Sequence, residues 1–207
     1  GALIALDLNG EEAMRILSNK SGQYLSLSRS VQSRQAYPTS IMGSMALLRQ
    51  LYYDADWYKK GNIKTTDLTL EAFNQNTNLT QIFAAGSRAN AVRADKVGDQ
   101  FDIQYTILGG GDEFERIEAI KNTNATFIIP INFPKPYDVE DPFLADRLEL
   151  ESMREWNQRP ANLSALEENK VPFAITMQGL KSTKSFKINI LSAIEQGLSK
   201  SEALKAL

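Results

Sequence analysis

The stretch QIFAAGSRANAVRADKVGDQFDIQYTILGGG, residues 81–111, decides the fold class of this chain. Apolar runs over 81–85 and 102–108 are short, and each is followed by glycine, as is typical of buried strands that end in a turn. Between them, residues 88–101 carry alanine and valine along one side of a predicted helix. Short apolar strands that alternate with amphipathic helices indicate a parallel sheet with right-handed helical crossovers.

The same alternation continues to the end of the chain. The spacing of apolar residues predicts strands over 125–132 and 172–177, and helices over 68–73, 112–121, 141–156, 160–168, 183–196 and from 199 onwards. Asp112 and Ser199 are predicted N-caps, because each is followed three residues later by a glutamate, as in a capping box. The sequence therefore predicts an α/β fold in which residues 66–207 form regular βα repeats.

Residues 1–65 form a less regular, partly helical leading segment. We expect short strands over 3–8 and 23–28, a helix over 11–17 and a long helix over 41–59. The long helix begins after a Pro-Thr-Ser sequence and has no internal proline. Because no linker separates this segment from the repeats, we expect a single α/β domain over residues 1–207.

The chain of 207 residues contains no histidine and no cysteine. Without cysteine there are no disulfides, thiolate metal sites or thiol nucleophiles, and without histidine the usual general base is missing. With 23 basic and 25 acidic residues the net charge is -2, which gives no electrostatic reason to expect nucleic-acid binding. Apolar runs are far shorter than the roughly 20 residues of a membrane span, so we expect no membrane insertion.

The candidate site residues follow the predicted strands, because function lies at the carboxyl ends of parallel strands in open sheets and in barrels. Ser87 follows the first of these strands, Gly109, Gly110 and Gly111 the second, and Gln178 the last. Ser87 would need a lysine as its base, and no Ser-x-x-Lys spacing supports that role in a meaningful context.

The glycine triplet has two interpretations. It is either a tight turn before a helix or a phosphate site built from free backbone N–H groups. It matches neither the dinucleotide fingerprint nor the P-loop, and Asp112 and Glu113 directly after it would repel an anion. The tight turn is therefore favoured over a ligand site at Gly109, Gly110 and Gly111.

Acidic residues form two groups near predicted helix starts. Asp112, Glu113, Glu115 and Glu118 would suit a hard-cation site made of oxygen ligands, or simply a solvated helix face. Asp138 belongs to a second group of the same kind. In both groups the solvated face is the favoured interpretation, because acids are common in the first turn of a helix.

Aromatic residues cluster on the long predicted helix. Tyr52, Tyr53, Trp57 and Tyr58 lie within two turns of one another. Core packing explains such a cluster, and an exposed platform for a sugar or a protein partner, centred on Trp57, is the alternative.

Several segments taken together resemble the amidohydrolase superfamily, and among its members the imidazolonepropionase-like metal-dependent hydrolases of Bacteroidetes. The resemblance rests on segments spread over most of the chain, none of which is a catalytic signature: YPTSIMGSMALLRQ at 37–50, YDADWY at 53–58, RADKV at 93–97, GGGDEF at 109–114, and the text from VPFAIT at 171–176 to GLSKSEAL at 197–204.

The resemblance implies a TIM-like (β/α)8 barrel of which this chain is the later part, about strands four to eight. It also implies zinc held by histidines and by an aspartate that ends the eighth strand. In this sequence the fifth-strand position corresponds to Ala84-Ala85, the sixth to Leu108-Gly109 and the eighth to residues 176–178, where Gln178 replaces the aspartate. A glutamine amide cannot act as a carboxylate base, and apolar side chains cannot replace imidazole ligands.

These observations leave three hypotheses for function. The first is a non-catalytic amidohydrolase-like domain of a longer parent chain, related to hydrolases of carbon–nitrogen bonds other than peptide bonds. The second is an active hydrolase, either with ligands outside this chain or with a rearranged site at Asp112, Glu113 or Asp138. The third is a small-ligand or carbohydrate-binding module. We expect no cofactor held by this chain, self-association into a homo-oligomer, and a periplasmic or secreted location, which the lack of cysteine suits.

Overall fold

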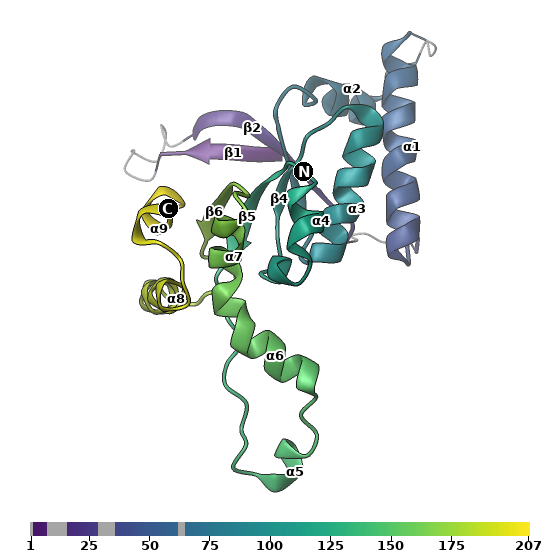
Figure 1. The fold of residues 1–207 in the computed structure, drawn as a ribbon. Helices are drawn as coiled ribbons and strands as arrows, with labels where there is room; N and C mark the ends of the chain where they lie inside the picture. The colour runs from purple at the N-terminus through teal and green to yellow at the C-terminus, as the bar shows by residue number, and fades with distance from the viewer. Residues whose placement is uncertain (1, 8–15, 29–35, 62–64) are drawn as a thin grey trace. The chain divides into compact units, whose positions relative to one another are not determined.

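The computed structural model describes residues 2–7, 16–28, 36–61 and 65–207, and it has an α/β fold (Figure 1). The chain divides into two compact units. Unit 1 consists of residues 1–84 and 93–106, and unit 2 of residues 85–92 and 107–207. The division passes through helix α3 (Arg88–Gly98) and strand β4 (Thr106–Leu108). That the whole chain is one domain stays a prediction.

Unit 1 contains three strands that lie side by side in chain order, β1 (Ala2–Leu6), β2 (Ile16–Ser26) and β3 (Thr80–Ala84). Strand β1 pairs antiparallel with β2, whereas β2 pairs in parallel with β3. The helix expected over 11–17 lies mostly outside the described residues, and its last two positions are strand. The antiparallel pair of β1 and β2 thus comes before the parallel strands that the sequence predicts.

The helices of unit 1 agree with the sequence. Helix α1 (Ile41–Lys59) has the predicted bounds, and the hydroxyl of Ser40 caps it by accepting a hydrogen bond from the Gly43 amide. Helix α2 (Leu68–Gln75) is capped in the same way by Asp67. The core of this unit is apolar and aromatic, and its buried members are Tyr52, Ala55, Phe73 and Val97.

The aromatic side chains of α1 therefore have two different environments. The ring of Tyr52 stacks on Phe101 with a centroid distance of 4.6 Å, and its hydroxyl lies 2.7 Å from that of Tyr105. Burial raises the pKa of Tyr52. Trp57, by contrast, is 47% exposed. Core packing is thus correct for Tyr52, whereas a ligand platform at Trp57 stays a prediction.

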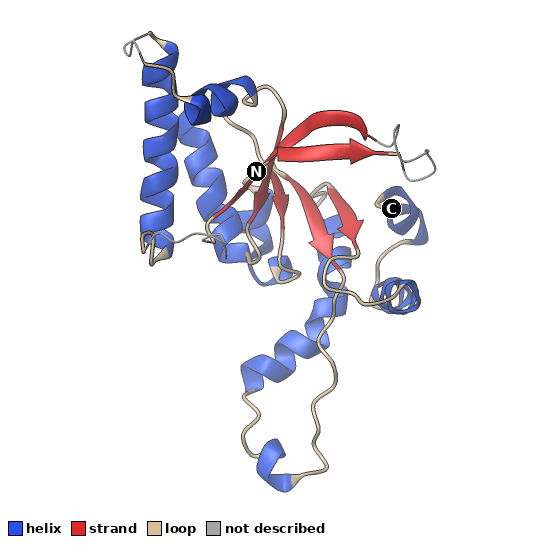
Figure 2. Cartoon of the chain, turned by 180° about the vertical axis from the view of Figure 1, so that it is seen from behind, coloured by secondary structure: helices blue, strands red, loops and turns tan. Residues whose placement is uncertain are grey.

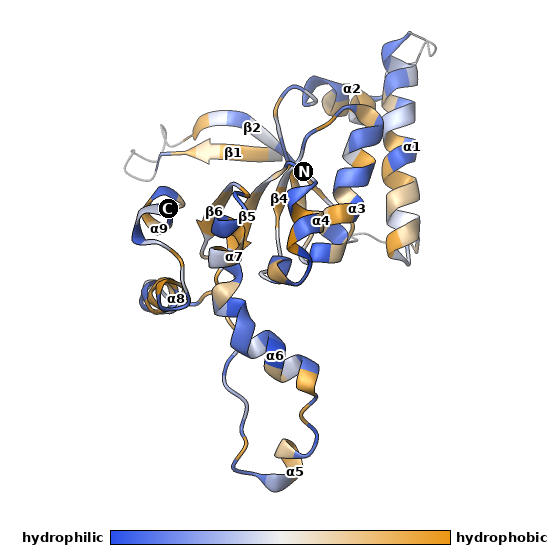
Figure 3. Ribbon diagram, in the orientation of Figure 1, coloured by the Kyte–Doolittle hydropathy of each residue, from blue (hydrophilic) through white to orange (hydrophobic). Residues whose placement is uncertain are grey.

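Unit 2 contains the last two residues of β4, and β5 (Thr126–Pro130) and β6 (Phe173–Thr176), and these strands are neighbours in that order. Strands β5 and β6 are parallel. Phe127 and Ile129 alternate with more exposed residues along β5 and are buried, as expected for a strand with one face in a core. Figure 3 shows β5 and β6 as hydrophobic, and helix α6 (Leu150–Gln158) as mostly hydrophilic.

The predicted helices of unit 2 are present, and those expected over 112–121, 141–156 and 160–168 are each divided into two. They are 3-10 helix η3 (Glu113–Arg116), α4 (Ile117–Lys121), α5 (Pro142–Ala145), α6, η4 (Arg159–Ala161), α7 (Asn162–Glu168), α8 (Thr183–Glu195) and α9 (Lys200–Lys205), shown in blue in Figure 2. Within the described ranges, no helix is long and apolar enough to cross a membrane.

The strand expected over 23–28 is β2, which begins earlier, at Ile16, and ends at Ser26. Two further elements differ in extent for physical reasons. The single helix expected over 141–156 is two separate helices, α5 and α6. Phe143 and Leu144 of α5 are exposed, so tertiary packing does not stabilise a continuous helix through this segment. The strand expected over 102–108 begins only at Thr106, since Asp102 has a left-handed φ of 55° after the 3-10 helix η2 (Asp99–Phe101).

Candidate functional site

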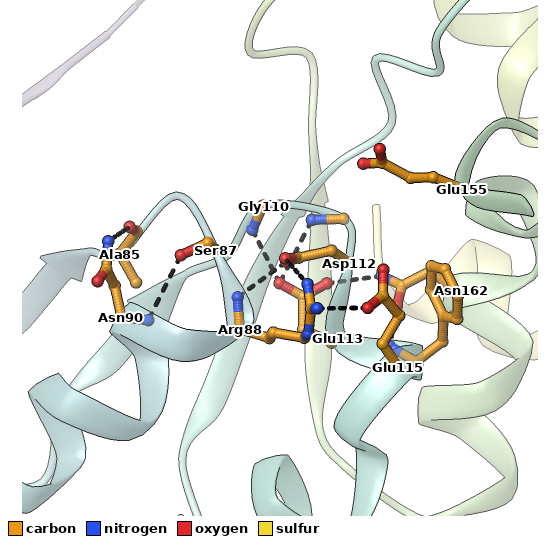
Figure 4. A network of polar contacts seen from close by, with 12 residues as sticks. Ala85, Ser87, Arg88, Asn90, Gly110, Asp112, Glu113, Glu115, Glu155 and Asn162 are labelled. Atoms are coloured by element: carbon orange, nitrogen blue, oxygen red, sulfur yellow. Dashed lines mark hydrogen bonds and ion pairs between the residues drawn. The ribbon is translucent and has the colours of Figure 1, made fainter. Parts of the chain in front are cut away.

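A polar network lies at the carboxyl end of β4, entirely within unit 2 (Figure 4). Asp112, only 7% exposed, accepts a hydrogen bond from the backbone amide of Arg88 at 2.8 Å. Its second oxygen accepts from the Arg88 guanidinium at 2.8 Å, and the same guanidinium forms an ion pair with Glu115. Both oxygens of Asp112 are therefore engaged by one arginine.

This arrangement corrects the predicted capping box. The side chain of Asp112 makes no hydrogen bond to the helix that follows it. Instead it binds the first amide of α3, where the helix dipole and a free N–H favour a carboxylate. Asp112 thus stabilises the N-terminus of a helix 24 positions earlier in the chain.

Glu113 is fully buried, with 0% exposure. One carboxylate oxygen accepts hydrogen bonds from the amides of Gly110 at 2.8 Å and Gly111 at 3.3 Å, and the other accepts from the Asn162 side chain at 2.7 Å. Burial raises the pKa of Glu113, and the hydrogen bonds from Gly110 and Asn162 act in the opposite direction. The solvated helix face expected for Asp112 and Glu113 is therefore wrong for these two residues.

The glycine turn is shaped around these carboxylates. A Cβ atom at Gly109 would collide with the Glu113 carboxylate, and one at Gly110 would collide with the backbone carbonyl of Gly86. Gly111 adopts a left-handed φ of 85°. The backbone N–H groups of Gly110 and Gly111, which a phosphate site would need, donate hydrogen bonds to Glu113. In this conformation they are therefore not available to bind an anion.

A second layer surrounds the turn. The guanidinium of Arg159 donates to the carbonyl of Gly110 at 3.1 Å and pairs with Glu155 at 2.5 Å. The side-chain oxygen of Asn162 accepts from the amide of Phe114 at 2.8 Å. These contacts hold the turn through side chains of η4 and α7, which come much later in the chain.

The remaining predicted site residues lie outside this network or serve other local roles. Ser87 accepts a hydrogen bond from the amide of Asn90 at 3.4 Å, which is the role of a helix N-cap. Gln178 is exposed, and its backbone N–H donates to the Thr176 hydroxyl at 3.3 Å. Asp138 is exposed and accepts from the amide of Glu140 at 3.0 Å.

Sequence reasoning missed Arg88, Arg159 and Asn162. The position of Arg88, directly after the Gly-Ser turn of a predicted strand, was an available signal. Asn162 and Arg159 come from 46 or more positions beyond Glu113, and no local motif marks them.

Zinc of the kind that the resemblance implies does not fit the residues present. The chain has no imidazole or thiolate to offer. Among the residues described in the structure, no group of three or more acidic, histidine or cysteine side chains is placed to hold a metal ion. Asp112 is the acid nearest the strand end, and an arginine occupies both of its oxygens.

The comparisons with known proteins give a fold. No family model matches the chain, and no curated protein matches it. A solved structure, the amidohydrolase from Thermotoga maritima MSB8, matches with a TM-score of 0.69 at 15% identity. The match covers 94% of this chain and 51% of that chain.

This chain shares the fold of part of an amidohydrolase. It spans about half the length of the solved protein it matches. At 15% identity the likeness concerns the fold alone, and it agrees with the predicted α/β class. The numbering of the strands as four to eight of a barrel stays a prediction.

Proposed function

We propose that this chain is an amidohydrolase-like domain with no catalysis of its own, in a parent protein related to hydrolases of carbon–nitrogen bonds other than peptide bonds. The observation that supports this proposal is that Asp112 and Glu113 occupy the carboxyl end of β4 in unit 2. The α3 N-terminus and the amides of the glycine turn, which suit a substrate anion, donate to Asp112 and Glu113. A site whose donors are satisfied within the chain has a structural role.

The finer parts of this proposal extend beyond the fold. They are a place among the imidazolonepropionase-like members, a longer parent chain, and a periplasmic or secreted location. The segments that resemble the family support the first, and the absence of cysteine suits an oxidising compartment.

A second function has one observation in its favour. The chain corresponds to about half of the Thermotoga maritima amidohydrolase, so the zinc ligands of a related parent would have a place outside these 207 residues. In that case this chain is the wall of an active hydrolase, and the network at Asp112 and Glu113 holds the wall rigid.

The test is the metal content of the full-length parent, purified without a histidine tag and measured by elemental mass spectrometry beside its Asp112→Asn variant. Absence of stoichiometric zinc in both proteins is the result expected from a non-catalytic domain. Near-stoichiometric zinc in both supports the wall of an active hydrolase. Zinc that is present in the parent and lost in an Asp112→Asn variant with unchanged circular dichroism and unfolding temperature would make Asp112 a ligand and overturn both proposals.

A further inference from the structure

A groove of about 630 Å³ lies in unit 2 between one face of α6 and the turn at η3. This volume is within the range of about 300–1,000 Å³ that is typical of small-molecule sites. The lining residues that matter here are Phe114, Glu115, Leu150, Glu151, Arg154 and Glu155. The last four lie on one face of α6, since they are separated by about one helical turn.

Two of the acidic side chains in this groove already form ion pairs with arginines. Glu115 pairs with Arg88, and Glu155 pairs with Arg159 at 2.5 Å. Both arginines belong to the network at the glycine turn, so these two carboxylates are neutralised within the chain. The charge that remains for a ligand comes from the other two charged residues of the groove.

Those two residues are Glu151 and Arg154. Within the part of the chain that the structure describes, neither side chain has a hydrogen-bond or ion-pair partner. They are three positions apart on α6, which places their Cβ atoms about 5–6 Å apart. The groove therefore presents one free carboxylate and one free guanidinium at a short separation.

The groove also has apolar lining residues beside these charges. Leu150 is 57% exposed, and Phe114 is partly buried beside it. A ligand that covers these side chains would gain roughly 25 cal/mol for each Å² of apolar surface removed from water. The groove thus combines both signs of charge with an apolar surface.

We propose that this groove binds a small zwitterion with an apolar side chain, of the chemical class of a free α-amino acid. The carboxylate of the ligand pairs with the Arg154 guanidinium, which suits a two-oxygen acceptor. The ammonium group pairs with Glu151, and the side chain lies on Phe114 and Leu150. A simple anion would meet Glu151, and a simple cation would meet Arg154, so each is disfavoured.

The test is titration calorimetry of the whole chain with L-phenylalanine as the probe. N-acetyl-L-phenylalanine, which lacks the ammonium group, and L-phenylalaninamide, which lacks the carboxylate, are the matched probes. The variants are Glu151→Gln and Arg154→Gln, and Arg147→Gln, an exposed arginine outside the groove, is the control. Far-UV circular dichroism verifies that each variant is folded.

We expect saturable binding of L-phenylalanine, and binding about tenfold weaker for each derivative, because each lacks one ion pair. Arg154→Gln should bind L-phenylalanine and its amide equally, and Glu151→Gln should bind L-phenylalanine and its N-acetyl form equally. Arg147→Gln should behave as the unchanged chain. Absence of saturable heat up to about 10 mM, or equal binding by the unchanged chain and both groove variants, would overturn the proposal. Neither result bears on zinc in the parent, so the amidohydrolase-like proposal stands or falls separately.

Discussion

At the scale of single residues, Asp95 makes the stability of unit 1 depend on pH. Burial, and secondarily the charge of Asp99, raises the pKa of Asp95 from 3.8 to about 6. The folded state then holds this proton more tightly than the unfolded chain does. The contribution of Asp95 to stability is therefore complete below the unfolded value of 3.8 and is lost as the pH rises through about 6.

Replacing Asp95 with asparagine imitates the protonated carboxyl group. We expect Asp95→Asn to raise the free energy of unfolding by about 1 kcal/mol at about pH 8, after allowance for solvent screening, and to change it little at about pH 3.5. Urea denaturation at the two pH values measures the difference. Asp146→Asn, the same change at an exposed position of unit 2, should show no such difference. Equal effects of Asp95→Asn at both pH values would contradict the assignment.

Single residues also show how far the sequence could predict local contacts. The N-cap at Ser199 is confirmed, because its hydroxyl accepts from the Glu202 amide at 3.1 Å one helical turn on. The reciprocal half of the predicted capping box is absent, since the Ser199 amide donates to the Glu167 carboxylate at 2.9 Å and not to Glu202. The same pattern at Asp112 and Glu115 was wrong, because Arg88 offers Asp112 an amide and a charge together. A local motif predicts a contact only where no distant partner binds more strongly.

At the scale of elements, the turn between β4 and η3 depends on close backbone approach. A Cβ atom at Gly110 would meet the carbonyl of Gly86, which is backbone and cannot rotate away. We expect Gly110→Ala to lower the free energy of unfolding by about 2–3 kcal/mol, in the range of substitutions that strain a packed site. Chemical denaturation of the variant measures this loss.

Gly86 is the matched control for this prediction. It has a left-handed φ of 67°, but nothing lies within 4 Å of a Cβ atom placed there. Gly86→Ala should therefore cost only the conformational strain of alanine, about 1–2 kcal/mol. A Gly110→Ala variant less affected than Gly86→Ala would mean that the turn does not approach Gly86 as described.

The helices and strands differ in how far the sequence could predict them. Helix α1 has the predicted bounds because its apolar spacing is long and uninterrupted, and Ser40 caps it locally. The prediction of one helix over 141–156 was wrong, because its apolar pattern includes Phe143 and Leu144, which are exposed and not packed in the core. The polar network was not predictable, since Arg159 and Asn162 reach the glycine turn only through the tertiary fold.

At the scale of the whole molecule, the resemblance predicted more than composition did. Periodicity gave the α/β class, and the segment resemblance pointed to the amidohydrolase fold that the solved Thermotoga maritima protein shares. The site did not follow from that fold, because the glycine turn is filled by Asp112 and Glu113. A fold is set by many apolar positions, whereas a site depends on a few polar ones.

Exposed apolar side chains on the first two strands predict self-association. Ile4 and Leu6 of β1 and Ile16 of β2 are between 48% and 58% exposed, and Leu6 lies opposite Ile16 in the strand register. Grouped exposed apolar residues mark protein contacts, because their burial removes apolar surface from water. We expect the mass from light scattering to rise with concentration above 23.1 kDa.

The double variant Leu6→Ser, Ile16→Ser should reduce this rise, whereas Leu68→Ser should not. Leu68 is a large exposed apolar residue at the start of α2, and it belongs to a different element from the strand pair. Because the strand pair supplies adjacent apolar side chains, two serines remove a joint contact surface there. A mass that stays at 23.1 kDa over the whole concentration range would show that these strands bind no second copy.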